Sequence, residues 1–348
     1  MALTLDTYRL LGRSGLRVSP LALGTATFGN EWGWGSEPDD ARTLFETYVE
    51  RGGNFVDTAA SYGGSERLLG DLTRGRRESL VLATKYSTLR TPGDPNSGGS
   101  HRKNLFASVE NSLRSLGTDY LDLLYVHVWD AATPGEEVLR GMDDLVRQGK
   151  VLYLGMSNAP AWEISRLQAI ADLRGWSPLV ALQIEYSLIN RAGERDLIPM
   201  AESLGLGVLP FSPLGGGVLS GKYTRADLTP SGEGGRKSFN ARLGMVTDRT
   251  LAIADVVREV AAEVERTPAQ VALAWNLGRP GVTAPVIGAR TPEQLRGNLD
   301  ALTLDLTDDQ TARLDAAGAL DLGYPHDVLT GDHLRAVMSG GLTIESRR

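Results

Sequence analysis

The sequence predicts an α/β fold, a (β/α)8 TIM barrel, and three observations predict it. Eight short apolar runs recur along the chain, helical patterns lie between them, and 348 residues suit such a barrel with insertions. A doubly wound parallel sheet with fewer strands is the alternative for the same alternation. The count of eight strand-then-helix units favours the barrel.

The apolar runs are typical of strands that are buried on both faces of a parallel sheet. Each is short, almost continuously apolar and bounded by turn residues. In chain order the eight predicted strands are residues 21–24, 54–57, 80–85, 121–127, 151–158, 179–185, 207–212 and 283–288.

Helical periodicity connects these strands. Residues 38–53 repeat apolar side chains on one face, with Pro38 suited to the first turn and Gly52 to the end. Ser65 is expected to cap the helix that follows the second strand. Further helical patterns cover residues 104–117, 135–148, 160–173, 193–204, 250–277 and 292–301.

Three segments lie outside this alternation. Residues 8–20 predict a hairpin that plugs the bottom of the barrel, and residues 318–348 an irregular tail that folds over it. The glycine-rich loop of about residues 213–249 follows the seventh strand, and a loop of this length is usually a lid or binding loop. The whole chain, residues 1–348, is expected to form one domain.

Composition excludes several classes of protein. A net charge of −7 argues against a nucleic-acid partner, and the lack of cysteine excludes disulfides and thiolate metal sites. The four histidines show no metal-ligand spacing. The N-terminus does not resemble a signal peptide, and no apolar run approaches the length of about 20 residues that crosses a membrane. A cytoplasmic enzyme is expected, while its oligomeric state is not predicted.

Polar residues stand where successive predicted strands end. Asp57 ends the second strand, Lys85 the third and His127 the fourth, and Tyr62 lies in the loop after the second. In a barrel these ends face one cavity. An ammonium lowers the pKa of a neighbouring phenol, a carboxylate keeps that ammonium charged, and an imidazole can bind a carbonyl oxygen. Together they can move a proton to or from an oxygen atom.

Each of these residues alone has an ordinary structural explanation. Asp57 and Lys85 could form only an ion pair, His127 could be a buried core histidine, and Tyr62 could simply pack in its loop. Their position at the same end of successive strands favours catalysis over these explanations.

The surrounding strings resemble those of the aldo-keto reductase superfamily, which includes bacterial NADP(H)-dependent reductases and the potassium-channel β subunits. NFVDTAASYGGSERLLG (54–70) is similar to the strand-two signature, and SLRSLGTDYLDLLYVH (112–127) to the segment with the histidine. The family's cofactor-binding segments are similar to four further strings of this chain: GMSN (155–158), LQIEYS (182–187), PFSPLGGGVLSGKY (210–223) and VIGARTPEQLRGNLDAL (286–302). The resemblance spans about residues 8–305. It implies a barrel that binds a nicotinamide cofactor without a Rossmann domain, and the chain has no G-x-G-x-x-G motif.

This resemblance implies the reaction and a set of cofactor contacts. NADPH would deliver hydride to a carbonyl carbon while Tyr62, as general acid, protonates the oxygen. Ser157, Asn158 and Gln183 would hold the nicotinamide carboxamide, and Phe211 would stack on its ring. The full set of implied cofactor residues is Gly24, Thr25, Asp57, Ser157, Asn158, Gln183, Phe211, Ser212, Leu214, Gly216, Leu219, Lys222, Gly288, Arg290, Gln294 and Asn298.

Arg290 decides the expected cofactor. A guanidinium binds phosphate in a bidentate manner, so Arg290 suits a 2′-phosphate and favours NADP(H). Gly288 and Gln294 stand where better-known branches carry lysine and arginine, so use of NAD(H) stays open. Residues 216–222, GGVLSGK, approach a P-loop motif, but Tyr223 follows where that motif needs Ser or Thr, which argues against an NTPase.

The substrate is predicted only as a small carbonyl or alcohol. Trp32, Trp34 and Trp129, with Tyr62 and His127, are the candidate substrate contacts for an alicyclic, sugar-like or aromatic ketone. Two other functions remain open. One is catalysis mainly as an alcohol or sugar dehydrogenase, and the other is a non-catalytic NADPH-binding regulatory subunit.

Overall fold

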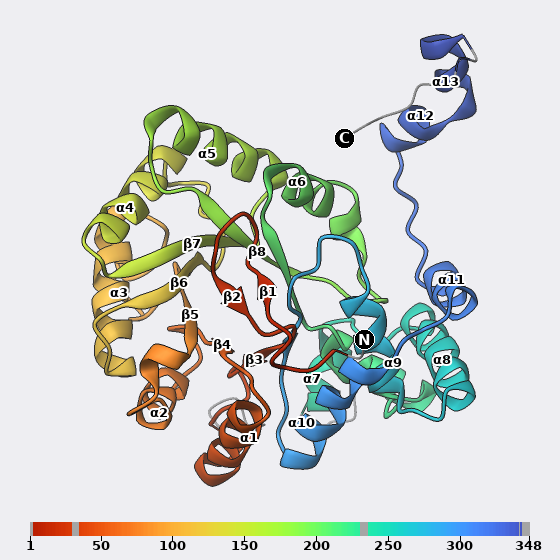
Figure 1. Cartoon of the computed structure of the whole chain (residues 1–348), viewed down its shortest axis with the longest axis horizontal. Helices are drawn as coiled ribbons and strands as arrows, with labels where there is room; N and C mark the ends of the chain where they lie inside the picture. Colours follow the sequence, from red (N-terminus) through yellow and green to blue (C-terminus); the bar gives the residue numbers. More distant parts are fainter. Residues whose placement is uncertain (1–2, 30–34, 230–235, 341, 343–348) are drawn as a thin grey trace.

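The computed structural model contains a parallel barrel with helices around its outside (Figure 1). It describes residues 3–29, 35–229, 236–340 and 342. Eight strands form one sheet in the order β10-β3-β4-β5-β6-β7-β8-β9. Their bounds are β3 Ala22–Gly24, β4 Phe55–Asp57, β5 Val81–Tyr86, β6 Leu121–Val126, β7 Val151–Ser157, β8 Leu179–Glu185, β9 Gly207–Phe211 and β10 Val286–Ile287.

The two edges of this sheet approach each other closely enough to close the barrel. At one seam Val286 and Ile287 of β10 pair in parallel with Ala22 and Leu23 of β3. At the other, Val208 of β9 makes a parallel bridge to Val282, just before β10. The predicted (β/α)8 barrel is therefore confirmed, and all eight predicted strands are present.

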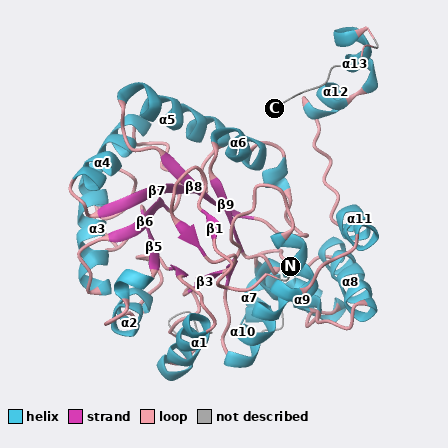
Figure 2. Cartoon of the chain, in the orientation of Figure 1, coloured by secondary structure: helices cyan, strands magenta, loops and turns pink. Residues whose placement is uncertain are grey.

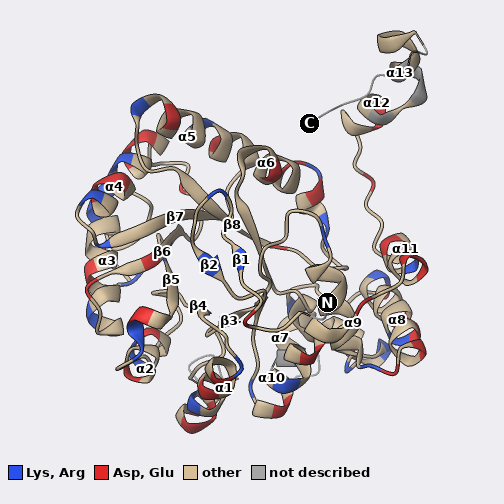
Figure 3. Ribbon diagram, viewed as in Figure 1, with Lys and Arg blue, Asp and Glu red and all other residues tan. Residues whose placement is uncertain are grey.

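Helices cover the outer face of the barrel (Figure 2). They are α1 Pro38–Glu50, α2 Ser65–Leu72, α3 Arg102–Leu116, α4 Gly135–Arg147, α5 Ala161–Arg174, α6 Leu197–Leu204, α8 Asp248–Glu263, α9 Pro268–Leu277, α10 Pro292–Leu299 and α11 Asp308–Ala317. Charged residues of both signs lie on these helices, whereas the strands carry few (Figure 3). None of the helices within the described residues is long and apolar enough to cross a membrane.

Two predicted helix features differ from the structure. The helix predicted over residues 250–277 is two helices, because Glu265 takes a left-handed conformation (φ 52°) and Thr267 then caps α9 ahead of Pro268. Ser65 does not cap α2, since Gly64 occupies that position. The Ser65 hydroxyl instead donates to the carbonyl oxygens of Thr25 and Phe28, which ties α2 to the loop after β3.

The predicted N-terminal hairpin is confirmed as an antiparallel pair, β1 Arg9–Leu10 and β2 Arg17–Val18. Leu11 and Val18 are fully buried in the apolar cluster that fills the barrel interior. That cluster includes Phe55 and Val81, the first residues of β4 and β5. The hairpin therefore plugs the end of the barrel at which the strands begin.

Short helices occur both in the long loop of residues 213–249 and in the C-terminal tail. The loop of residues 213–249 carries short helices, η3 Gly215–Ser220, η4 Arg225–Leu228 and α7 Arg236–Arg242. The tail contains α12 His326–Thr330 and α13 Asp332–Ser339, which lie away from the barrel (Figure 1). The described part of the tail therefore differs from the prediction, since it contains two short helices and does not fold over the barrel.

Candidate active site

Four polar residues meet where the barrel strands end, and we call Asp57, Tyr62, Lys85 and His127 the strand-end group. Asp57 is the last residue of β4, Lys85 lies on β5, and His127 directly follows β6. Lys85 Nζ lies 2.5 Å from Asp57 Oδ2 and donates to the Thr58 carbonyl at 2.9 Å. Because parallel strands share one direction, their carboxyl ends bring these side chains together.

Tyr62 connects the ammonium with the imidazole. Lys85 Nζ lies 5.1 Å from the centre of the Tyr62 ring, within the range of a cation–π contact. The rings of Tyr62 and His127 meet edge to face, with centroids 5.9 Å apart. The predicted arrangement of a phenol between an ammonium and an imidazole is therefore present in the structure.

Burial and charge set the protonation of this group. Burial opposes the charged form of Lys85, yet Asp57 and Tyr62 together raise the pKa of its ammonium above the ordinary value. Burial also raises the pKa of Tyr62, against the lowering influence of Lys85. At neutral pH Lys85 is therefore a cation beside a protonated Tyr62 phenol. The ammonium acts as the sequence predicts, but burial outweighs its effect on the phenol.

His127 is neutral at the same pH. Burial, with the nearby Lys85 cation, lowers the pKa of its imidazole to about 4. Its Nδ1 atom is buried and has no hydrogen-bond partner among the described residues. A neutral imidazole keeps one N–H donor, which can point at a carbonyl oxygen without a net charge in the site.

Gln183 joins the strand-end group from the opposite side of the barrel. Its Nε2 donates to Asp57 Oδ1 at 2.8 Å, while the other Asp57 oxygen accepts from Lys85. Asp57 is thus held by two donors. The family resemblance implies a contact of Gln183 with the cofactor carboxamide, and in the structure the Gln183 amide orients the Asp57 carboxylate.

A cavity of about 640 Å³ opens above these residues. Most of the predicted site residues line it: Gly24, Asp57, Tyr62, His127, Ser157, Asn158, Gln183, Phe211, Ser212, Leu214, Gly216, Lys222, Gly288, Arg290, Gln294 and Asn298. One continuous space therefore connects the strand-end group with the loops after β9 and β10.

Further lining residues were not predicted. They are Ala26, Thr27, Pro213, Gly217, Ser220, Thr267, Ala269, Val286, Ile287, Ala289, Glu293 and Gly297. Most adjoin a strand end or a predicted site residue, which is a signal that the sequence offers. Thr267 and Ala269 begin α9, and predicting one helix over residues 250–277 concealed that helix start.

Other predicted contacts lie elsewhere. Thr25 and Leu219 are fully buried, and Lys85 lies beneath the cavity rather than on its wall. Trp129 does not line the cavity. Its ring lies beside Gly135, the first residue of α4. The two remaining substrate candidates, Trp32 and Trp34, lie outside the described residues.

The cavity wall contains uncommon backbone conformations. Asn158 (φ 47°) and Ser212 (φ 50°) are left-handed, although neither is glycine. Such strain collects at functional sites, where surrounding contacts hold it in place. The Asn158 amide donates to the His127 carbonyl at 2.9 Å, which accounts for one of these contacts.

A glycine turn begins η3 beside a cation. Gly215, Gly216 and Gly217 have φ values of 54°, 62° and 94°, a run that L side chains rarely adopt. A Cβ at Gly217 would lie 2.8 Å from Lys222 Nζ. Backbone amides in such a turn, with an ammonium close by, suit a diphosphate.

The far end of the cavity lies at the start of α10. Arg290 is half-buried there, and its guanidinium forms no salt bridge with any described carboxylate. The Gln294 side-chain oxygen accepts from the Arg290 backbone N–H at 2.9 Å. Arg290, Gln294, the Phe211 ring and the glycine turn thus line one cavity together.

Comparison with known proteins agrees with this geometry. A model of the aldo/keto reductase family matches residues 20–319. Norsolorinic acid reductase of Aspergillus flavus is 38% identical over 338 residues, which cover 93% of this chain and 84% of that protein. Aryl-alcohol dehydrogenase [NADP(+)] of Phanerodontia chrysosporium is 35% identical over 337 residues, 91% of this chain and 87% of that protein. The similarity thus extends over nearly the whole barrel.

Proposed function

This chain belongs to the aldo/keto reductase family, and we propose that it reduces an aldehyde or ketone with NADPH, using Tyr62 as the proton donor. Family membership makes it a carbonyl-reducing oxidoreductase with a nicotinamide cofactor. The observation that carries the finer proposal is the meeting of the strand-end group at one end of the 640 Å³ cavity.

The strand-end group divides the proton transfer among its members. Tyr62 gives its proton to the carbonyl oxygen as negative charge develops there. Lys85 stabilises the phenolate that remains, and Asp57 keeps Lys85 charged. Neutral His127 donates a hydrogen bond to the same oxygen and fixes its direction. These roles use both the acid and the electrostatic stabilisation that carbonyl reduction needs.

The cofactor would occupy the remainder of the cavity. Ser157 and Asn158 would bind the carboxamide, Phe211 would stack on the nicotinamide, and the glycine turn with Lys222 would hold the diphosphate. When bound, NADPH supplies the hydride. Arg290 supports NADP(H), because its guanidinium has no described ion-pair partner and suits a 2′-phosphate. A relative named for NADP(+) supports the same choice.

The proposed substrates are aromatic aldehydes and ketones. The relatives are named for norsolorinic acid and for aryl alcohols, which favours an aromatic group beside the reacting carbonyl. The latter name also supports a second candidate, oxidation of an aryl alcohol, since the strand-end group can accept a proton as well as give one. Trp32 and Trp34 remain proposed contacts for this aromatic group.

Steady-state kinetics with a carbonyl panel test the proposal. Aryl aldehydes, alicyclic ketones, keto-sugars and keto-mycotoxins would each be tried with NADPH and NADH, and aryl alcohols with NADP⁺. We expect the highest kcat/KM with an aryl carbonyl and NADPH. NADPH binding without turnover across the panel would contradict the proposal and favour the regulatory subunit.

A further inference from the structure

Tyr125 lies inside the barrel directly beneath the strand-end group. On β6 it is the register partner of Lys85 on β5, and on its other side it pairs with Gly155 of β7. It is fully buried within the apolar cluster of the barrel interior. Tyr125 therefore belongs to the same layer of side chains as Lys85, one strand away.

The neighbouring strands leave room for its ring. A Cβ on Gly155 would lie 2.6 Å from Cδ1 and Cε1 of Tyr125, so only glycine fits beside the ring at this point. The next strand contributes Ala181, which is also small. The Tyr125 ring therefore lies between Lys85 on one side and the space left by Gly155 on the other.

The Tyr125 ring lies beside the Lys85 ammonium. Nζ is 5.9 Å from the Tyr125 ring centroid and 5.1 Å from that of Tyr62, so the cation lies near two aromatic rings. Lys85 is 1% exposed, so little water is available to solvate it. Cation–π attraction is strongest for such a desolvated cation.

The Tyr125 hydroxyl has no matching role. It is buried and makes no hydrogen bond of good geometry within the described residues. Burial and the Asp57 charge raise the pKa of this phenol well above its ordinary value, although the nearby Gln183 amide opposes this rise, so it stays neutral. The hydroxyl adds no charge to the site, which leaves the ring as the part that acts on Lys85.

We propose that Tyr125 is a positioning residue of the reaction, whose ring face stabilises the charged form of Lys85 and so helps Tyr62 to act as an acid. The inference rests on the proposed function of the strand-end group. The groups that face Lys85 are Asp57, Tyr62 and Tyr125, with His127 beyond Tyr62. Of these, Tyr125 is the one that neither pairs with the ammonium nor lines the cavity.

A graded change of the ring tests this role without a change of shape. Tyr125→Phe keeps the ring and removes the hydroxyl. Phenylalanine analogues with one, two or three ring fluorines at position 125 then withdraw electrons from the ring face while the volume stays nearly constant. Turnover of 4-nitrobenzaldehyde with NADPH would be measured for each variant across a range of pH, together with the Kd for NADPH.

We expect Tyr125→Phe to keep kcat within about threefold of the wild type. From there kcat should fall with each fluorine, by about 5- to 30-fold in all, the rate equivalent of a buried cation–π contact. The Kd for NADPH should change less than about threefold, because Tyr125 does not line the cavity. Loss of a merely structural residue would not follow the number of fluorines.

The ionisation of Lys85 gives a second measurement, independent of turnover. The chain contains five lysines, so the ¹³Cε resonance of Lys85 can be assigned with a Lys85→Met sample and titrated in the unliganded protein. We expect its pKa to decrease with each added fluorine, since a weaker ring face stabilises the ammonium less. Tyr48→Phe removes a buried hydroxyl that donates to the Leu21 and Phe55 carbonyls and touches no member of the strand-end group, so it should lower the melting temperature and leave this titration unchanged.

The outcomes separate this inference from the proposed function. A flat fluorine series in both kcat and the Lys85 titration would overturn the role of Tyr125, even if Tyr62→Phe abolishes turnover. A large loss in Tyr125→Phe itself, with no further loss on fluorination, would also overturn it and assign the role to the hydroxyl. Retained turnover in Tyr62→Phe would instead contradict the proposed function.

Discussion

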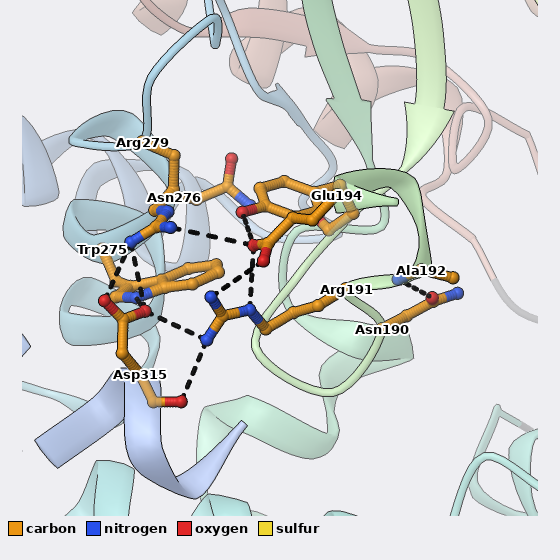
Figure 4. A network of polar contacts seen from close by, with 9 residues as sticks. Asn190, Arg191, Ala192, Glu194, Trp275, Asn276, Arg279 and Asp315 are labelled. Atoms are coloured by element: carbon orange, nitrogen blue, oxygen red, sulfur yellow. Dashed lines mark hydrogen bonds and ion pairs between the residues drawn. The ribbon is translucent and has the colours of Figure 1, made fainter. Parts of the chain in front are cut away.

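Cations, carboxylates and aromatic rings meet in several clusters of the described residues, and two of these differ in whether they adjoin the cavity. The first is the strand-end group. The second, which we call the α9 network, consists of Arg191, Glu194, Arg279 and Asp315 around the ring of Trp275 (Figure 4). None of these four charged residues lines the 640 Å³ cavity.

The α9 network joins three segments of the chain. Arg191 donates to both oxygens of Glu194 and to Asp315, and Arg279 also donates to Asp315. Both guanidinium groups lie over the Trp275 ring, at 5.3 and 5.1 Å from its centroid. The loop after β8, the end of α9 and helix α11 are thereby fixed to one another.

The difference lies in which protons can move. Both cations of the α9 network are arginines, which stay charged and do not exchange protons in proteins. The α9 network also contains a phenol, since Tyr186 donates to Glu194 at 2.5 Å. The strand-end group differs in that its cation is a lysine and that a neutral imidazole lies beside its phenol, and both of these groups can titrate. A buried ionic cluster is therefore not evidence of a functional site by itself. Titratable groups that adjoin a cavity are the stronger sign.

Lys85→Met should have the largest effect on the reaction. Loss of the ammonium leaves the Tyr62 phenolate without its cation, so kcat should fall by about 10²–10⁴, as for a positioned acid. The Kd for NADPH should change little, because Lys85 lies beneath the cavity. Steady-state kinetics and a cofactor titration would measure both. Wild-type turnover in Lys85→Met would remove the lysine from the mechanism.

Arg191→Met is the matched change in the α9 network. It also replaces a buried cation with methionine, but it should destabilise the fold by about 3 kcal/mol, since the partner carboxylates lose their main donor. Turnover at a permissive temperature should stay within about threefold of the wild type. Urea unfolding and kcat would be measured on one sample. A loss of kcat as large as in Lys85→Met would contradict the distinction between the clusters.

Arg290→Ala should weaken NADPH binding by about 1.5–3 kcal/mol, the value of a hydrogen bond to a charged group. NADH lacks the 2′-phosphate, so its Kd should change much less. Arg296→Ala is the control, because Arg296 lies on α10, which begins just after Arg290, and pairs with Glu293. Equal weakening of both cofactors would show that Arg290 does not bind the 2′-phosphate.

Glu66→Gln should have the smallest effect, and it concerns a buried carboxyl without a cation. Burial raises the pKa of Glu66, against hydrogen bonds from Ser112 and Thr84. A carboxyl whose pKa is higher in the folded state stabilises the protein at acid pH and loses this contribution as the pH rises. The variant should therefore flatten the loss of unfolding free energy that occurs as the pH rises from the ordinary carboxyl pKa of 4.5 through the raised pKa of Glu66, by an amount on the order of 1 kcal/mol. An unchanged profile would contradict this assignment.

Local patterns were enough to predict the barrel and most of the site. Runs of neighbouring residues predict all eight strands and the hairpin. The shared direction of the parallel strands then places Asp57 near Lys85 and His127, beside the cavity. The single-domain and cytoplasmic assignments stay predictions. So do the roles of the individual site residues.

Features that depend on packing between distant segments were not predicted. Asp315 is more than 100 residues from Arg191, and no local pattern connects them. Tyr125 reads as one more apolar strand residue until the register places it beside Lys85. Trp129 follows the histidine closely, yet its ring lies beside Gly135 of α4 and does not line the cavity.

Tyr62→Phe tests the central claim most directly, since it removes one oxygen and keeps the ring. We expect kcat with an aryl aldehyde to fall by about 10²–10⁴, while the Kd for NADPH stays within about 1 kcal/mol of the wild type. The double variant with Lys85→Met should lose little more than either single variant, because the two residues act as one unit. Turnover of Tyr62→Phe close to that of the wild type would contradict the assignment of Tyr62 as the acid.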